Sequence, residues 1–205
     1  AAKKEAEKSG LDVVPGTFLG NDNQKFQLAY IGGQTLELEA AKAFTVMVAA
    51  AKLDGVDISL NSGFRAPFEG LTGKTTKGKS FNISGQLDVR TKDRWRADRT
   101  SSKTGKPCGE WNDENRKFAA TNCFQPATAP CGSSKHGIGI AADINTSGFS
   151  DVNPATSALT NVYVWMALNG WKYGFIRTVR SETWHYEYHP DKAKKGPYAG
   201  LTGGK

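Results

Sequence analysis

Two short segments of the chain contain the residue types that activate water on a metal ion. The first segment contains His136 and Asp143, and the second contains Glu182 and His185. Two imidazoles and one carboxylate are a standard ligand set for a catalytic zinc ion, which keeps its fourth position for water. Glu182 lies three residues before His185, where it can act on that water as a general base. The pattern therefore predicts a Zn²⁺ site held by His136, Asp143 and His185.

The spacing of the first pair limits how the chain can run. Seven residues separate His136 from Asp143 by roughly 23 Å on a strand and by roughly 10 Å on a helix. The ligand atoms of one zinc ion lie within roughly 4 Å of one another. The chain must therefore bend, and Gly137 and Gly139 stand where a bend costs least. We expect His136 in a loop that leads into a strand over residues 138–144, which carries Asp143.

The elements that position these residues can be read from the apolar pattern. A helix is predicted from an N-cap at Thr35 to a stop at Gly55, followed by a strand over residues 56–60. One face of this helix is apolar at helical spacing and predicts a core stripe of Leu36, Ala40, Phe44, Met47, Val48 and Ala51. The segment before it, residues 11–34, is expected to form one or two short strands or a hairpin.

The second half of the chain is also expected to contain a helix followed by strands. Asn153 and Pro154 indicate the start of a helix that ends at Gly170. Strands are expected over residues 171–175 and 184–188. In the latter, alternation places His185 and Glu187 on one face and the aromatic residues Trp184, Tyr186 and Tyr188 on the other.

Composition indicates a globular protein with polyanionic partners. The chain has 205 residues, 38% of them hydrophobic, and a net charge of +7. No apolar run approaches the roughly 20 residues that would span a bilayer. Residues 66–130 contain twelve Lys and Arg against seven Asp and Glu, a net charge of +5. We interpret this basic segment as a wall of the substrate groove or a cell-wall-binding surface; a solvated face and a nucleic-acid surface around Trp95 are the alternatives.

The cysteines are few and clustered. Cys108, Cys123 and Cys131 lie close together and contain no Cys-x-x-Cys pair, which argues against a structural zinc knuckle. In an oxidising compartment these cysteines can form one disulfide and leave one free thiol.

Four motifs together resemble a known enzyme family. They are Ser-x-His-x6-Asp from Ser134, Glu-x-x-His from Glu182 with Trp184 inside it, Ser-Gly-Phe-Arg ending at Arg65, and Trp-x-Tyr-Gly-Phe from Trp171. They resemble the zinc D-Ala-D-Ala carboxypeptidases and dipeptidases of the VanY and VanX type (peptidase M15), which include the L-alanyl-D-glutamate endopeptidases of phage endolysins.

This resemblance implies both a fold and a set of roles. The fold would be α+β, with helices packed on a small, mainly antiparallel sheet, as in the hedgehog/DD-peptidase-like fold. The substrates would be peptidoglycan stem peptides, met outside the cell or in the periplasm, and no nucleic acid would be bound. Glu182 would be the catalytic base, Arg65 would bind substrate carboxylate or the developing oxyanion, and Ser134 would help to hold the carboxylate. Without the resemblance, a surface arginine is the better interpretation of Arg65, and a turn or cap hydroxyl is the alternative for Ser134.

The expected organisation is a lead-in over residues 1–34, a zinc peptidase domain over 35–190 containing the basic segment 66–130, and a loose tail over 191–205. The chain has no initiator Met, and we expect it to be processed or to belong to a larger phage or cell-envelope assembly. A wall-binding or phage-tail module that retains the peptidase fold is the alternative function. Such a module has no need of Glu182, which favours an enzyme.

Overall fold

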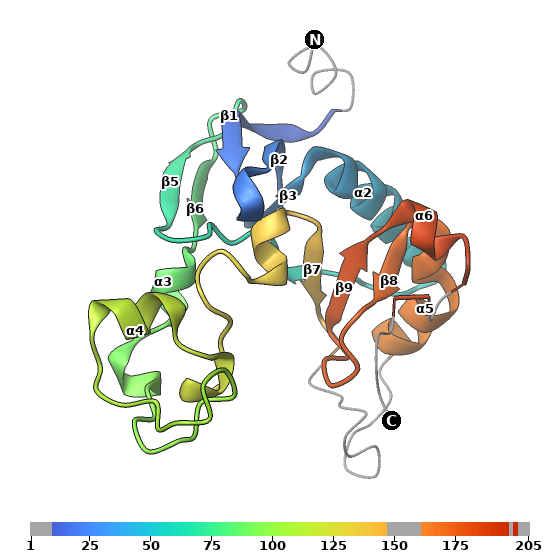
Figure 1. Cartoon of the computed structure of the whole chain (residues 1–205). Helices are drawn as coiled ribbons and strands as arrows, with labels where there is room; N and C mark the ends of the chain where they lie inside the picture. The colour runs from blue at the N-terminus through green and yellow to red at the C-terminus, as the bar shows by residue number, and fades with distance from the viewer. Residues whose placement is uncertain (1–9, 147–160, 197–198, 201–205) are drawn as a thin grey trace.

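The computed structural model describes residues 10–146, 161–196 and 199–200. Its N-terminal part is a three-stranded antiparallel sheet of β1 (Asp12–Leu19), β2 (Lys25–Ile31) and β3 (Gln34–Glu37), in that order. A short 3-10 turn, η1 (Asn21–Asn23), joins β1 to β2. The predicted hairpin is therefore present and gains a third strand. In Figure 1 this sheet lies above the centre of the molecule, next to helix α2.

Helix α2 (Leu38–Leu53) begins later than the sequence pattern predicts. The prediction of Thr35 as its N-cap is wrong, because Thr35 belongs to the ladder between β3 and β2. The cap is Glu37, whose Oε2 accepts hydrogen bonds from the backbone N–H groups of Glu39 and Ala40, both at 3.0 Å. The predicted stop is confirmed, since Gly55 follows the helix with a φ of 75°.

The central sheet has the antiparallel order β4 (Leu60–Ser62), β7 (Ala141–Ile144), β9 (His185–Tyr188), β8 (Phe175–Arg177). Helices α2 and α5 (Asn161–Asn169) bury their apolar residues against one face of this sheet. The cluster that they share with the strands includes Phe44, Met47, Ala142, Ile144, Trp165, Met166, Phe175 and Tyr186. The other face is left for polar residues. An α+β fold with antiparallel sheets and few helices is thus confirmed.

Two boundaries in the second half differ from the prediction or lie outside the described residues. The strand expected over residues 171–175 is wrong: Gly170–Tyr173 form the 3-10 turn η6, and Gly174, at a φ of 87°, ends it just before β8 begins. The predicted start of α5 at Asn153 and Pro154 lies outside the described residues. A short helix, α6 (Pro190–Ala193), follows β9, and the rest of the predicted tail is described only in part.

The basic segment is folded into two units. The first is a hairpin of β5 (Leu71–Lys74) and β6 (Ser80–Ile83). The second, residues 86–131, is called the disulfide lobe below; it contains α3 (Gln86–Val89), η2 (Lys92–Arg94), α4 (Asp113–Phe118) and η3 (Thr121–Cys123). Figure 1 shows the lobe standing apart from the sheets. Its two ends meet, because the side-chain amide of Gln86 donates to the carbonyl of Ala129 at 2.6 Å.

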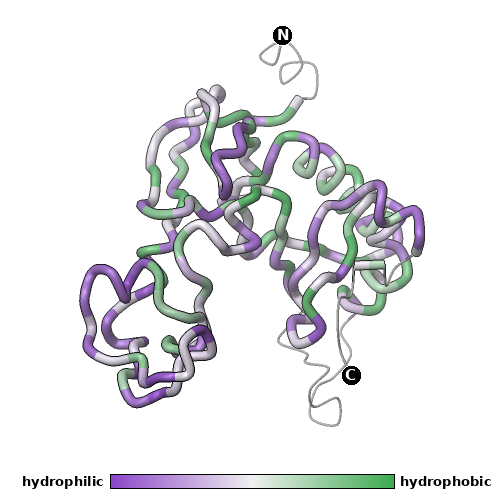
Figure 2. The backbone as a smooth tube through the Cα atoms, in the orientation of Figure 1, coloured by the Kyte–Doolittle hydropathy of each residue, from purple (hydrophilic) through white to green (hydrophobic). Residues whose placement is uncertain are grey.

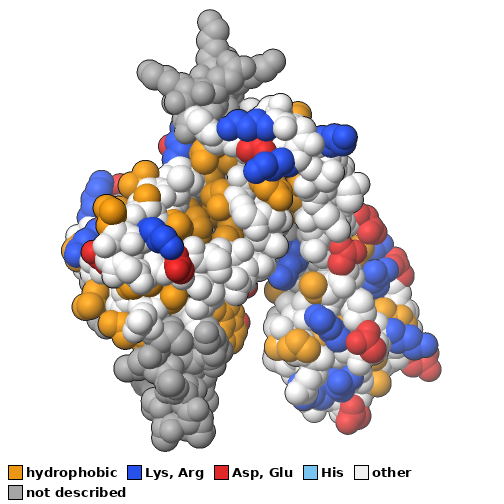
Figure 3. Space-filling model, turned by 180° about the vertical axis from the view of Figure 1, so that it is seen from behind, with side chains coloured by type: hydrophobic (Ala, Val, Ile, Leu, Met, Phe, Trp, Pro, Cys, Tyr) orange, Lys and Arg blue, Asp and Glu red, His pale blue; other side chains and the backbone are white. Residues whose placement is uncertain are grey.

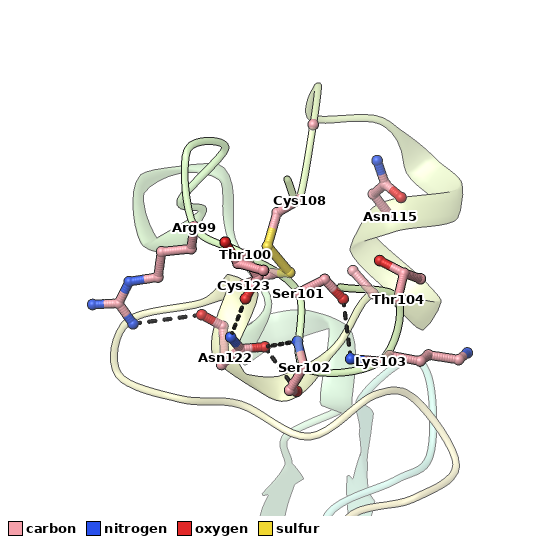
Figure 4. The surroundings of a disulfide bond; sticks show 12 residues. Arg99, Thr100, Ser101, Ser102, Lys103, Thr104, Cys108, Asn115, Asn122 and Cys123 are labelled. Atoms are coloured by element: carbon pink, nitrogen blue, oxygen red, sulfur yellow. Dashed lines mark hydrogen bonds between the residues drawn. A yellow bond between two sulfur atoms is a disulfide. The ribbon is translucent and has the colours of Figure 1, made fainter. Parts of the chain in front are cut away.

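The disulfide lobe has a small core of its own. A disulfide joins Cys108 to Cys123, while Cys131 is a buried free thiol. Beside the disulfide, Trp95, Trp111 and Phe124 pack edge to face, with Trp95 and Phe124 centroids 5.1 Å apart. As Figure 4 shows, Asn122 fastens the neighbouring loop, because its side chain donates to the carbonyl of Thr100 and accepts from the N–H of Ser102.

A buried arginine completes this core. The side chain of Arg90 is fully buried and stacks over Phe124 at 4.0 Å. It donates hydrogen bonds to four backbone carbonyls, those of Asn115, Arg116, Ala119 and Thr128. Burial lowers the pKa of Arg90 to about 10, so the side chain remains charged at neutral pH. Carbonyl dipoles, several at the end of α4, therefore solvate the charge in place of water.

The surface of the lobe is polar. Figure 2 shows that much of the lobe is hydrophilic, whereas apolar residues follow α2 and the central sheet. On the face seen in Figure 3, acidic and basic side chains are mixed over the lobe. Within the described part of the chain, no helix has the length and apolar character that crossing a membrane requires.

Candidate active site

Asp143 and His185 are neighbours because of the register of the central sheet. They lie directly opposite each other on the antiparallel strands β7 and β9. Residues opposite each other on paired strands point to the same face, and their side chains lie within contact distance. Ala142, Ile144 and Tyr186 alternate with them and enter the core. The polar pair therefore lies on the face that the helices leave uncovered, with Asp143 Oδ1 2.9 Å from His185 Nδ1.

His136 reaches this face through a turn. It lies in the 3-10 turn η4 (Lys135–Ile138), which Gly139 ends at a φ of 77°, and β7 begins two residues later. The predicted loop leading into a strand is therefore present, with the strand beginning at Ala141. The carbonyl of Gly63, at the end of β4, accepts a hydrogen bond from His136 Nδ1 at 2.7 Å. Gly63 itself packs closely against the backbone of Thr35, because a Cβ on it would lie 2.1 Å from the carbonyl oxygen of Thr35.

The three predicted ligands converge and could hold one metal ion. His136, Asp143 and His185 each offer a ligand atom, and these atoms all lie within 4.8 Å of one another. His136 Nδ1 donates to a carbonyl, and its Nε2 lies 3.3 Å from Asp143 Oδ2, where it can bind a metal ion once it carries no proton. His185 faces Asp143 through Nδ1. Two neutral imidazole nitrogens and a carboxylate oxygen are a donor set that suits zinc.

Glu187 supports His185 from behind and has no role in the predicted site. It is 1% exposed, and its Oε1 lies 3.4 Å from His185 Nε2. The same carboxylate accepts hydrogen bonds from Thr178 at 2.6 Å and from His189 at 2.7 Å. A carboxylate behind a ligating histidine fixes the tautomer and orientation of the ring. The signal was present in the sequence, where Glu187 shares the face of His185.

The ionisation of the site depends on these contacts. Burial opposes the charge of Asp143, but hydrogen bonds from both histidines hold its pKa far below the usual range. Burial would lower the pKa of His185, but hydrogen bonds to Asp143 and Glu187 raise it to about 9. Without a metal ion, His185 is therefore protonated at neutral pH, with Nδ1 facing Asp143 and Nε2 facing Glu187.

Glu182 lies beside His136, Asp143 and His185, called the triad below, and is not part of it. One of its carboxylate oxygens is 3.8 Å from His185 Nδ1, and its side chain is 41% exposed. It faces a cleft of about 360 Å³ that is also lined by His136, Asp143 and His185. The fourth predicted residue is therefore near the ligand atoms and accessible to water and substrate.

Arg65 and Ser134 line the same cleft. The strand β4 ends at Ser62, and Arg65 follows three residues later in the lining of the cleft. The Arg65 guanidinium donates to Gln86 Oε1 at 3.5 Å and makes no ion pair with any residue in the described ranges. Burial lowers the pKa of Arg65, an effect that the charge of Asp143 opposes. Ser134 is buried immediately before η4, and its backbone carbonyl accepts from the side chain of Asn21 at 2.6 Å.

The disulfide lobe forms one wall of the cleft. Its contribution includes Val89, Arg94, Thr121 and the segment from Pro126 to Ala129. The basic segment is thus close in space to residues that are distant in sequence. Trp184 also lines the cleft. The prediction that it faces away from His185 is wrong, because β9 begins only at His185 and strand alternation does not extend to Trp184.

The sequence matches the family described as VanY, D-alanyl-D-alanine carboxypeptidase, over residues 33–191. The chain belongs to this family. VanY enzymes are peptidoglycan carboxypeptidases, and the triad of this VanY-family chain is the group that can hold the metal ion. No curated protein matches the chain.

Two solved structures share the VanY fold with this chain. One is a variant of the vancomycin resistance D,D-pentapeptidase VanY from the VanB-type resistance cassette, in complex with Zn(II); it has 21% sequence identity and a TM-score of 0.52, with 94% of each chain covered. The other is VanYB in complex with D-alanine-D-alanine, with 21% identity and a TM-score of 0.53, covering 90% of this chain and 92% of that one. At this identity the likeness shows the fold.

Proposed function

We propose that this VanY-family protein is a zinc-dependent carboxypeptidase that removes the terminal D-alanine from peptidoglycan stem peptides. The observation that supports it best is the composition of one cleft. A triad able to hold a metal ion, a free carboxylate at Glu182 and an arginine without an acidic partner in the described residues all face the same space. The VanYB complex with D-alanine-D-alanine and the Zn(II) complex of a VanY enzyme support the substrate and the metal.

In this proposal His136, Asp143 and His185 hold zinc. A zinc ion at such a site polarises a carbonyl oxygen and lowers the pKa of water. Glu182 accepts the proton of the attacking water and later passes it to the leaving amine. This step requires a carboxylate that is ionised and near the triad, and Glu182 is 3.8 Å from the Nδ1 of His185 and part exposed.

Arg65 and Ser134 position the peptide. A carboxypeptidase must recognise the terminal carboxylate of its substrate, and the planar guanidinium of Arg65 can bind a carboxylate through two parallel hydrogen bonds. The hydroxyl of Ser134, in the same cleft, adds a donor. Because Gln86 occupies one side of the Arg65 guanidinium, the side chain is already oriented before substrate binds.

The disulfide also agrees with an extracellular or periplasmic site of action. A Cys108–Cys123 bond persists where the compartment is oxidising, which is where peptidoglycan is found. The mixed charges of the lobe in Figure 3 give less support to a purely electrostatic wall-binding surface.

Digestion of a defined pentapeptide stem, followed by mass spectrometry, tests this function. We expect free D-alanine and a tetrapeptide, with loss of activity in a chelator and recovery with zinc. Products cut between L-alanine and D-glutamate would instead make the protein an endopeptidase of the endolysin type. Binding to walls without any cleavage by the zinc-loaded protein would support the wall-binding or phage-tail module.

A further inference from the structure

The cleft contains a second arginine for which the proposed reaction has no use. Arg94 is the last residue of η2 in the disulfide lobe, and it lines the cleft together with Arg65. The two charges are close enough to interact: beyond the effect of burial, the charge of Arg94 lowers the pKa of Arg65. Their mutual repulsion is relieved when each of the two arginines binds an anion.

Arg94 is held in place by the lobe. One guanidinium nitrogen donates to the carbonyl of Val89 at 3.2 Å, and the backbone carbonyl of Arg94 accepts from the N–H of Gln125 at 2.8 Å. The next residue, Trp95, belongs to the aromatic core beside the disulfide. A guanidinium has five N–H donors, and this contact uses one. Arg94 makes no ion pair with a residue in the described ranges, so its other donors are available to a ligand.

The balance of charge in the cleft favours more than one anionic group on the substrate. Arg65, Arg94 and Lys135 line it against two acids, Asp143 and Glu182. A zinc ion held by His136, Asp143 and His185 would add further positive charge to this space. One terminal carboxylate can pair with Arg65 and leaves Arg94 without a partner.

We propose that Arg94, with the hydroxyl of Thr121 in the same cleft, forms a second anion subsite that binds a carboxylate on the amino-terminal side of the scissile bond. This inference rests on the proposed carboxypeptidase function. The departing alanine has one carboxylate, which Arg65 takes, so a second carboxylate must belong to the acyl part of the peptide. The ligand is therefore a stem peptide with a free acidic group upstream, such as the carboxylate of a glutamyl residue. Peptides in which that group is an amide lose the ion pair.

Two synthetic stem pentapeptides that differ only in this group, free carboxylate against carboxamide, provide the test. Release of D-alanine is measured with the zinc-loaded wild type, with Arg94→Gln and with Arg94→Lys. The control is Arg96→Gln, since Arg96 is two residues away but does not line the cleft. We expect the wild type to prefer the acidic peptide about tenfold in kcat/KM, through KM, as charge-assisted hydrogen bonds are about twice as strong as neutral ones.

In Arg94→Gln the ratio of the two kcat/KM values is expected to fall to about one. We expect Arg94→Lys to retain part of the preference for the acidic peptide and Arg96→Gln to retain all of it. A wild type without preference, or a preference that survives in Arg94→Gln, overturns the subsite. If Arg96→Gln also abolishes the preference, the preference comes from the general charge of the lobe, and the Arg94 subsite is overturned.

A second measurement separates this inference from the function on which it rests. Calorimetric titration of the same two peptides into the zinc-loaded protein carrying Glu182→Gln reports binding without cleavage. If the wild type releases no D-alanine, the proposed function fails. The subsite then stands or falls on whether the acidic peptide binds about tenfold more tightly and whether adding Arg94→Gln removes the difference.

Discussion

Replacing Glu187 by glutamine is expected to weaken zinc binding by an amount that depends on pH. The substitution keeps an oxygen of the right shape behind His185 Nε2, 3.4 Å away, but removes the negative charge. Loss of such a partner typically costs 10- to 100-fold in metal affinity, which corresponds to about 1.4 to 2.7 kcal/mol. The full cost is expected only where no proton competes with the metal.

Below pH 9 a proton does compete. The pKa of His185 is about 9 in the metal-free protein, so binding of zinc at pH 7 must displace a proton. This competition lowers the apparent affinity of the wild type by roughly 100-fold between pH 9 and pH 7, since each unit below the pKa costs tenfold. The hydrogen bond to Glu187 helps to raise the pKa of His185. In the Glu187→Gln variant the pKa of His185 is therefore lower, and protonation reduces the apparent zinc affinity less.

The ratio of wild-type to variant affinity is therefore expected to be largest near pH 9 and to shrink toward pH 7. Competition with a chelating dye at the two pH values measures it. Glu39→Gln is the matched control, because Glu39 is exposed on α2 and paired with Lys42. Equal affinities at pH 9 would remove Glu187 from the metal site. A ratio that grows toward pH 7 would show that Glu187 does not raise the pKa of His185.

Four further variants test separate parts of the structure. His185→Ala should lose stoichiometric zinc and activity together, and a full equivalent of zinc by elemental analysis would contradict the ligand assignment. Glu182→Gln should keep its zinc while kcat falls at least ~100-fold, the scale of a lost general base; near-normal turnover would exclude it from the mechanism. Arg90→Lys replaces five donors by three, so chemical denaturation should show a loss of about 1 to 3 kcal/mol for each carbonyl left unpaired, and unchanged stability would contradict the role of Arg90. Cys108→Ser with Cys123→Ser opens a 15-residue loop and should cost about 3 kcal/mol by the same measurement, whereas an equally stable variant would mean that the aromatic core alone holds the lobe.

The sequence predicted which residues would meet in the site better than it predicted their surroundings. His136, Asp143 and His185 could be grouped from ligand chemistry and spacing, and the register between β7 and β9 brings the last two together. Strand alternation placed Glu187 on the face of His185, but the motifs did not show that its carboxylate contacts the ring of His185. Trp184 was misplaced because alternation applies only inside a strand, and one residue decides the boundary.

The disulfide lobe was the least predictable part. Charge and cysteine content marked it as unusual, but its packing depends on contacts between distant residues, such as the pairing of Gln125 N–H with the carbonyl of Arg94. Neither cysteine connectivity nor the solvation of Arg90 by four carbonyls can be read from composition. The position of Arg94 in the cleft follows from that packing.

The hydrogen bond between Gln86 and Ala129 makes the disulfide lobe a segment that could be replaced as a unit. Because the side-chain nitrogen of Gln86 at one end of the lobe lies 2.6 Å from the carbonyl oxygen of Ala129 at the other, the chain leaves the catalytic body and returns to it at nearly the same place. The residues between Gln86 and Ala129 can change in number and sequence without moving β7 or β9, provided that this hydrogen bond and the residues that line the cleft remain. Grafting a different lobe between these two positions is thus a route to new peptide selectivity on an unaltered hydrolytic centre.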